Sequence, residues 1–190
     1  MPEGDNKVRI LALEVGGPIA RLCITEHDRR SISSGQSIKC PDRKLVKEAE
    51  IECSLHPTII SLVAEFLEGE DEISIGVFSL ACFIANDQTC NLLKIPHWPQ
   101  IKAVELKAAL SIKEVFLLND FEAPCYALPY LQESDLIPLT DHQPQPDATV
   151  GLLGPRLGLG EAFMLPGNVV LATEGGHTEF PAMDDEDWEL

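Results

Sequence analysis

The segment from Val115 to Asp120 most constrains the fold, because four apolar residues run directly into an amide and an acid. A run of this length between polar residues is typical of a strand in a parallel sheet that is covered on both faces. The residues from Phe121 onward predict a helix, whose first turn tolerates Pro124. Asn119 and Asp120 are therefore predicted to lie in a strand-to-helix turn, where open α/β sheets place ligands.

Two roles are open for Asp120 at this turn. A carboxylate there can accept a proton from a substrate hydroxyl. It can also cap the helix that follows, and the spacing alone favours capping. The remaining segments of the chain have to distinguish the two.

The composition predicts a globular protein with one good core or two small ones. The chain has 190 residues, of which 45% are hydrophobic, and its mean hydropathy is +0.03. No apolar run approaches the ~20 residues that a membrane-spanning helix needs. The first residues, Met1-Pro-Glu-Gly-Asp-Asn6, lack the basic and apolar regions of a signal peptide. We therefore expect a cytoplasmic location and no membrane association.

The charge balance excludes most polyanionic partners. The 31 acidic residues outnumber the 14 basic ones, which gives a formal net charge of −17. Such a surface repels nucleic acid and anionic membranes. A phosphorylated nucleotide stays possible as a ligand, because backbone amides, a magnesium ion and a few local cations can hold phosphates.

The cysteines are expected to be buried and reduced. No two of them form a Cys-x-x-Cys pair, and most fall within apolar runs, so we expect neither disulfides nor zinc. The six are Cys23, Cys40, Cys53, Cys82, Cys90 and Cys125.

The N-terminal part predicts a sheet with helices packed on it. Residues 8–13 and 20–24 form a predicted hairpin with glycines at its tip, and residues 26–47 a surface excursion with at most one short strand. A helix is predicted from Pro57 to Gly69 and a buried strand over residues 73–81. A second helix, over residues 101–110, leads back to Val115.

The C-terminal part changes character after Tyr130. Residues 132–147 are polar and rich in proline, as expected of a crossover between lobes. A strand over residues 148–153 then enters a glycine-rich turn, where backbone can approach a phosphate closely, and a second strand leaves it. A short strand over residues 169–172 precedes Glu174, and the acid-rich residues 182–190 predict the start of a helix.

Several of these segments together resemble the bacterial-type glucokinases. The segment Leu118-Asn-Asp-Phe-Glu-Ala123, followed by Ala127-Leu-Pro129, is similar to the central motif of that family. Further similar segments occur in the same order, at residues 8–24, 73–98, 151–162 and 174–177. The resemblance implies an α/β fold with the actin-like (ribonuclease H-like) ATPase architecture. A nearly complete first lobe would span residues 1–131 and a partial second lobe residues 132–190, so that about half of the family's length is represented.

The resemblance also implies an activity, ATP-dependent phosphorylation of the 6-hydroxyl of glucose. Asp120 would be the catalytic base, and glucose would be held by Asn119, Asp120, Glu174 and His177. The nucleotide phosphates would face Glu14, Gly16, Gly17, Gly154, Gly158 and Gly160. ATP and Mg²⁺ are the implied cofactors, with no residue assigned as a metal ligand, and a homodimer is left open as the assembly.

Departures from the family pattern fall on both phosphate segments and on one wall of the sugar site, where the family's Thr-Asn is not recognisable beside Leu93-Lys-Ile-Pro-His-Trp98. Pro18 replaces a threonine and Glu14 an aspartate in the first hairpin, and Arg156 and Leu157 stand where the second usually has glycine and threonine. Pro18 removes both a hydroxyl and an N–H donor. Three hypotheses follow: an active glucokinase, a non-catalytic sugar-binding or regulatory remnant of one, and an interaction module that uses its acidic surface.

Overall fold

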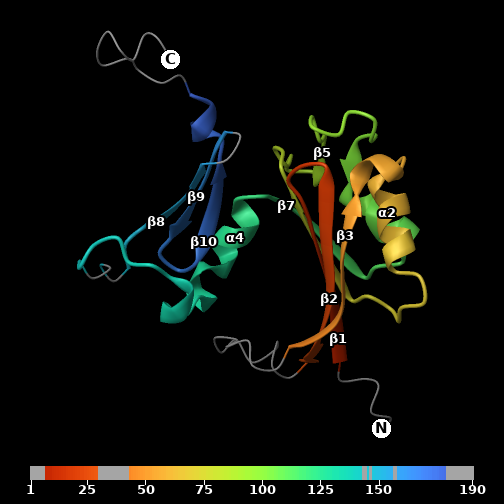
Figure 1. Cartoon of the computed structure of the whole chain (residues 1–190), viewed down its shortest axis with the longest axis horizontal. Coiled ribbons are helices and arrows are strands. Elements are labelled where there is room, and N and C mark those ends of the chain that lie inside the picture. Colours follow the sequence, from red (N-terminus) through yellow and green to blue (C-terminus); the bar gives the residue numbers. More distant parts are fainter. Residues whose placement is uncertain (1–6, 30–42, 143–144, 146, 156–157, 179–190) are drawn as a thin grey trace.

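The computed structural model describes residues 7–29, 43–142, 145, 147–155 and 158–178. Two sheets, with helix α4 (Glu122–Ala127) between them, make up most of this part of the chain (Figure 1). The predictions made for Arg156, Leu157 and the acid-rich C-terminal segment lie outside the described residues.

The first sheet has five strands in the order β3-β2-β1-β4-β7. Strands β1 (Lys7–Val15), β2 (Ile19–Asp28) and β3 (Lys44–Glu52) pair antiparallel, whereas β4 (Ile75–Leu80) and β7 (Glu114–Asn119) continue the sheet in parallel with β1. The prediction that residues 8–13, 73–81 and 115–118 share one sheet is confirmed. In the register of the parallel strands, Val15 pairs with Leu80 and Leu80 with Asn119. The residues that follow these strands therefore meet at one edge.

The core of this part lies between the sheet and two helices, α2 (Ile59–Phe66) and α3 (Ala103–Leu110). Helix α2 flanks the sheet, and α3 contacts both α2 and β7 (Figure 1). The largest fully buried side chains are Phe78, Leu11, Ile24, Leu62, Leu80, Leu106, Ile112 and Leu117. The apolar spacing that predicted α2 is thus the spacing of its buried face, whereas in α3 only Leu106 is buried.

Helix α2 begins two residues later than Pro57 because Thr58 caps it. The Thr58 hydroxyl accepts a hydrogen bond from the Ser61 amide at 3.0 Å, and the Ser61 hydroxyl accepts one from the Thr58 amide at 3.3 Å. This reciprocal arrangement is a capping box. Gly69, predicted to end the helix, follows its last turn with a φ of +77°.

Strand β3 is longer than the sequence predicted. It runs for nine residues, where at most one short strand was expected between residues 26 and 47. It is an edge strand whose exposed side chains alternate with half-buried ones, and Ala49 and Ile51 pack against the core. Ion pairing helps to hold it, as the Arg21 Nε atom of β2 lies 2.9 Å from a carboxylate oxygen of Glu50.

The second sheet has three antiparallel strands in the order β10-β9-β8. They are β8 (Val150–Pro155), β9 (Leu159–Leu165) and β10 (Val169–Thr173). Helix α4 packs on this sheet through Cys125, which is buried with Ala162 and Met164. A division into lobes near residue 131 stays a prediction.

The smaller elements complete the described part. Strands β5 (Thr89–Cys90) and β6 (Ile101–Lys102) form a two-stranded ribbon. The 3₁₀ helices are η3 (Cys53–Leu55), η4 (Leu128–Tyr130), η5 (Glu133–Asp135) and η6 (Gly175–His177). No helix within the described residues is both long and apolar enough to cross a membrane.

Truncating the core should destabilise the fold strongly. Leu62 is fully buried, so Leu62→Ala removes its packing and leaves a cavity, at an expected cost of about 2–5 kcal/mol in the free energy of unfolding. Leu139→Ala is the matched control, because Leu139 is 95% exposed, and we expect a change within about 0.5 kcal/mol. Urea denaturation followed by circular dichroism measures both. Equal losses in the two variants would contradict the assignment of the core.

Candidate functional site

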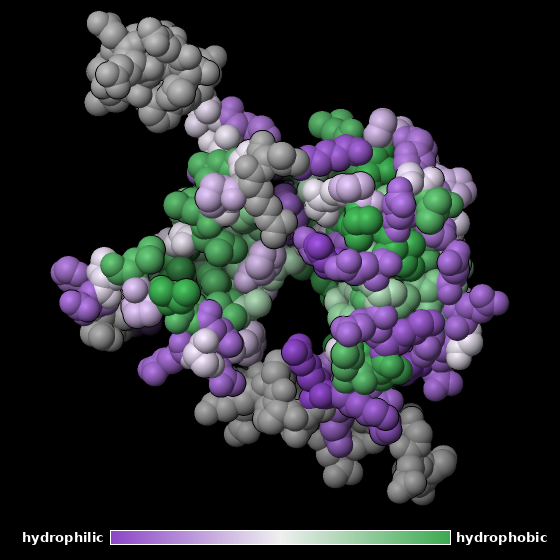
Figure 2. Space-filling view, viewed as in Figure 1, coloured by the Kyte–Doolittle hydropathy of each residue, from purple (hydrophilic) through white to green (hydrophobic). Residues whose placement is uncertain are grey.

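A cleft of about 860 Å³ opens at the edge where β4 and β7 end, and it reaches the turn between β8 and β9. The molecule is hollowed between the parts built around the two sheets (Figure 2). All ten candidate site residues from the sequence line this cleft: Glu14, Gly16, Gly17, Asn119, Asp120, Gly154, Gly158, Gly160, Glu174 and His177. Segments far apart in the chain are therefore brought to one place.

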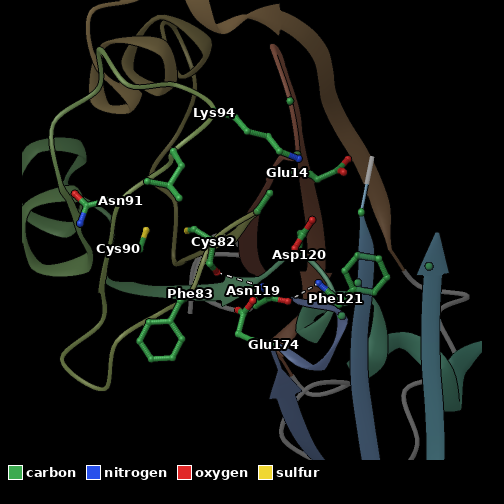
Figure 3. Close-up of a pocket in the computed structure, with 18 of the residues that line it drawn as sticks. Glu14, Cys82, Phe83, Cys90, Asn91, Lys94, Asn119, Asp120, Phe121 and Glu174 are labelled. Carbon is green, nitrogen blue, oxygen red and sulfur yellow. Dashed lines mark hydrogen bonds between the residues drawn. The ribbon is translucent and has the colours of Figure 1, made fainter. Parts of the chain in front are cut away.

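Asn119 fastens the turn at the end of β7. Its side-chain oxygen accepts hydrogen bonds from the backbone amides of Phe121 at 2.8 Å and Glu122 at 3.4 Å. Its side-chain nitrogen donates to the carbonyl oxygen of Cys82, in the turn after β4, at 3.2 Å (Figure 3). Asn119 thus binds the first amides at the start of α4, a role that the sequence had offered to Asp120.

Asp120 lies where the two parallel strands end. Its backbone amide donates to the Leu80 carbonyl at 3.1 Å, which continues the ladder between β4 and β7. Its half-buried side chain points into the cleft (Figure 3). A ligand hydroxyl in the cleft can therefore reach the carboxylate.

Glu174 and His177 face the cleft from the other side, in and just before η6. The Nδ1 atom of His177 lies 2.9 Å from a carboxylate oxygen of Glu174, and both side chains are largely exposed. Glycines hold this turn against β9, since a Cβ atom on Gly176 would collide with the backbone carbonyl of Leu159. The paired glycines thus fix the position of the acid and the imidazole.

Gly154 and Gly160 have a packing role that the sequence did not predict. They pair directly across β8 and β9, and the ring of Phe121 lies against both. A Cβ atom on either glycine would collide with that ring. At Gly158, by contrast, a Cβ atom would meet no other heavy atom within 4 Å, so the backbone there is open to the cleft.

The tip of the β1–β2 hairpin forms a further wall of the cleft. Gly16, Gly17 and Pro18 line it, and the space around a Cβ position on Gly17 is empty. The Glu14 carboxylate lies 3.3 Å from Arg21, and the neighbouring carboxylates raise the pKa of that guanidinium. Pro18 lines the cleft without an N–H, so it cannot donate a hydrogen bond to a phosphate there.

Sequence reasoning missed several residues of the cleft. Lys94, Phe83, Cys82 and Cys90 all line it, from β5 and the irregular segments that flank it. Lys94 extends into a cleft that also holds the carboxylates of Glu14, Asp120 and Glu174 (Figure 3). They lie within residues 73–98, which resemble the family, but that resemblance gave none of the four a role in the site.

Two solved structures share the fold of this chain. The crystal structure of glucokinase from an Antarctic psychrotroph matches 95% of this chain with a TM-score of 0.71 at 21% identity, and 54% of that chain is covered. Glucokinase from Balamuthia mandrillaris, solved in complex with glucose, matches 98% with a TM-score of 0.70 at 18% identity, again over 54% of its length. The chain therefore has the actin-like ATPase architecture of sugar kinases, as predicted.

Sequence comparison narrows the class to a family. The glucokinase family model matches residues 11–190. A glucokinase-like protein of Xylella fastidiosa (strain Temecula1) is 29% identical over 99% of this chain and 54% of its own length. A glucokinase of Nostoc punctiforme is 32% identical over 70% of this chain and 40% of its own. The chain belongs to the glucokinase family, and it spans about half the length of the curated relatives it matches.

A methyl group on Gly160 should disturb the packing next to Asp120. Gly160→Ala collides with the Phe121 ring, so we expect the free energy of unfolding to fall by about 1–3 kcal/mol. Gly158→Ala is the control and should change it by less than about 0.5 kcal/mol. Urea denaturation measures both variants.

The collision should disappear when the ring is absent. In a Phe121→Ala background, Gly160→Ala should cost almost nothing, because the two substitutions act on one contact. A full additive loss in the double variant would show that the glycine is needed for another reason.

Proposed function

We propose that the chain carries the glucose-binding half of a glucokinase and that, alone or in a longer native form, it transfers a phosphoryl group from ATP to the 6-hydroxyl of glucose. The supporting observation is that Asp120, Glu174 and His177 come from separate segments and line one cleft. The chain also belongs to the glucokinase family.

Glucose recognition falls to Glu174, His177 and Asn119. The Glu174 carboxylate can accept hydrogen bonds from two vicinal hydroxyls of the sugar. Because Glu174 contacts the Nδ1 atom of His177, the Nε2 atom of His177 is left to bind a third hydroxyl. The Asn119 side-chain nitrogen carries two hydrogens, of which one goes to the Cys82 carbonyl. The second is left for a sugar hydroxyl.

Asp120 is the proposed base. As the sugar oxygen attacks the γ-phosphate, the 6-hydroxyl loses its proton to a carboxylate held in place by the turn. The backbone amide of Asp120 and the cap formed by Asn119 keep that carboxylate oriented. The remaining catalysis comes from positioning and charge stabilisation.

The nucleotide would lie along the two hairpins. Backbone amides of Gly16, Gly17 and Gly158 are the donors proposed for its phosphates, with Gly154 and Gly160 shaping the wall beside them. A carboxylate such as that of Glu14 suits a hard cation, so it would lie near Mg²⁺. When bound, the ion would neutralise part of the phosphate charge.

The alternative is a non-catalytic sugar-binding or regulatory family member. Pro18 favours it, because this residue occupies the cleft wall without a donor. Both functions share sugar binding and differ in nucleotide binding and turnover.

Calorimetry measures the binding of glucose and the binding of ATP independently. Glu174→Ala should weaken glucose binding about tenfold or more, because it removes a charged acceptor worth about 1.5–3 kcal/mol. Glu133→Ala, in η5 and outside the cleft, is the matched control and should bind glucose as the parent does. Weak or absent ATP binding beside firm glucose binding would favour the non-catalytic alternative. Tight ATP binding without glucose binding would contradict both.

Asp120→Asn tests the proposed base. It keeps the shape and hydrogen bonding of the side chain but cannot take the proton, so turnover should fall by about 10²–10⁴-fold. Glucose affinity and unfolding free energy should hardly change. A coupled assay for glucose 6-phosphate and denaturation measure these. Undiminished turnover would place the base elsewhere, and an unfolded variant would show that Asp120 is structural.

A further inference from the structure

Two cysteines meet in the wall of the cleft. Cys82 lies in the turn after β4 and Cys90 in β5, and both line the cleft. Their side chains lie next to one another in this wall (Figure 3), close enough for each thiol to shift the pKa of the other. Cys90 is 4% exposed, whereas Cys82 is half-buried. All cysteines in the described part of the chain are free thiols.

The contact prepares one of the two sulfurs for oxidation. The neighbouring Cys82 thiol lowers the pKa of Cys90, because an S–H group stabilises a nearby thiolate, and this effect outweighs burial. The Cys90 sulfur, together with burial and the carboxylates of Asp120 and Glu174, raises the pKa of Cys82. The pair therefore loses its first proton more easily and its second with more difficulty than two separate thiols. A thiolate beside a thiol is the arrangement from which disulfides form.

The intervening chain can accommodate a disulfide. To form the bond, the two sulfurs have to approach to about 2.05 Å. Residues 81–88 contain neither helix nor strand, so a small shift there breaks no regular element. Phe83, within this segment, is 68% exposed, whereas Cys82 and Ile84 pack against the core and limit the shift to a small one.

We propose that Cys82 and Cys90 are a reversible redox pair, which a small peroxide that enters the cleft converts into a disulfide. The Cys90 thiolate attacks hydrogen peroxide, and the O–O bond breaks to give a sulfenic acid and, after protonation, one water. The Cys82 sulfur then attacks the sulfenic sulfur and displaces the second water. The two thiols lose two electrons and two protons, and the peroxide takes them up. A dithiol reductant reverses the reaction.

The disulfide would act on the site through one hydrogen bond. Asn119 donates to the Cys82 carbonyl at 3.2 Å, and its side-chain oxygen closes the turn that carries Asp120. A shift of Cys82 therefore reaches the amide proposed to bind glucose. This consequence, unlike the thiol chemistry itself, rests on the proposed function.

The test is a cross-link between two fragments. The full chain is treated with hydrogen peroxide, alkylated, and cleaved before Asp87, which separates Cys82 from Cys90. Mass spectrometry should find the two fragments joined and, after reduction, apart. Cys82→Ser and Cys90→Ser should each abolish the joined species, whereas Cys23→Ser, in β2, should leave it unchanged. Separate fragments with oxidised Cys23, or accumulation of sulfinic acid on Cys90, would overturn the proposal.

A second measurement tests whether the disulfide weakens glucose binding. By calorimetry, the oxidised chain should bind glucose at least about fivefold more weakly than the reduced chain, and Cys90→Ser should show no such difference. Equal affinities in both states would overturn the coupling. A chain that binds no glucose in either state would contradict the proposed function, and the cross-link alone would then decide on the thiol pair.

Discussion

The candidate site depends on the side chain of Asn119. This carboxamide joins two elements that the chain separates, since its nitrogen bonds the turn after β4 and its oxygen bonds the first amides of α4. A half-buried amide with both ends satisfied fixes the backbone around it, and leaving either partner unsatisfied would cost about 1–3 kcal/mol. The Asp120 carboxylate is therefore held in place, because Asp120 lies between Asn119 and Phe121, whose positions these hydrogen bonds fix. A base that has to meet one hydroxyl benefits from such preorganisation.

The next residue, Phe121, links the two sheets. It follows β7 and places its ring against Gly154 and Gly160. Any residue larger than glycine at these two positions would collide with the ring. The glycine-rich turn is thereby brought to the cleft by apolar packing, whatever ligand it holds. Residues 119 to 121 thus cap a helix, offer a carboxylate and bind a second sheet, which explains why so short a segment organises the site.

The sequence predicted those parts of the fold in which local pattern and tertiary burial agree. Strands β4 and β7 are apolar because the parallel sheet buries them, and the spacing of α2 matches its buried face. Strand β3 was not predicted, although residues 48–52 alternate between acidic and apolar residues and Ala49 and Ile51 pack against the core. In the site, Asp120, Glu174 and His177 were found through motifs that resemble a family. Lys94 and the Cys82–Cys90 contact were not, because they depend on how the segments around β5 fold back on the sheet, which neither spacing nor composition encodes.

The charges of the cleft distinguish its two proposed ligands. Glu14, Asp120, Glu161 and Glu174 line it within a chain of formal net charge −17, against the cations Arg21 and Lys94. Arg21 is already engaged by Glu14 and Glu50 at 3.3 and 2.9 Å. A neutral polyol gains from such a surface, because carboxylates accept hydrogen bonds from hydroxyls without any charge to offset. A nucleotide triphosphate meets repulsion unless a divalent cation and the backbone amides of the hairpin tips compensate. With Pro18 in one of those tips, the compensation in this chain has one donor fewer, so the electrostatics of the cleft favour sugar over nucleotide.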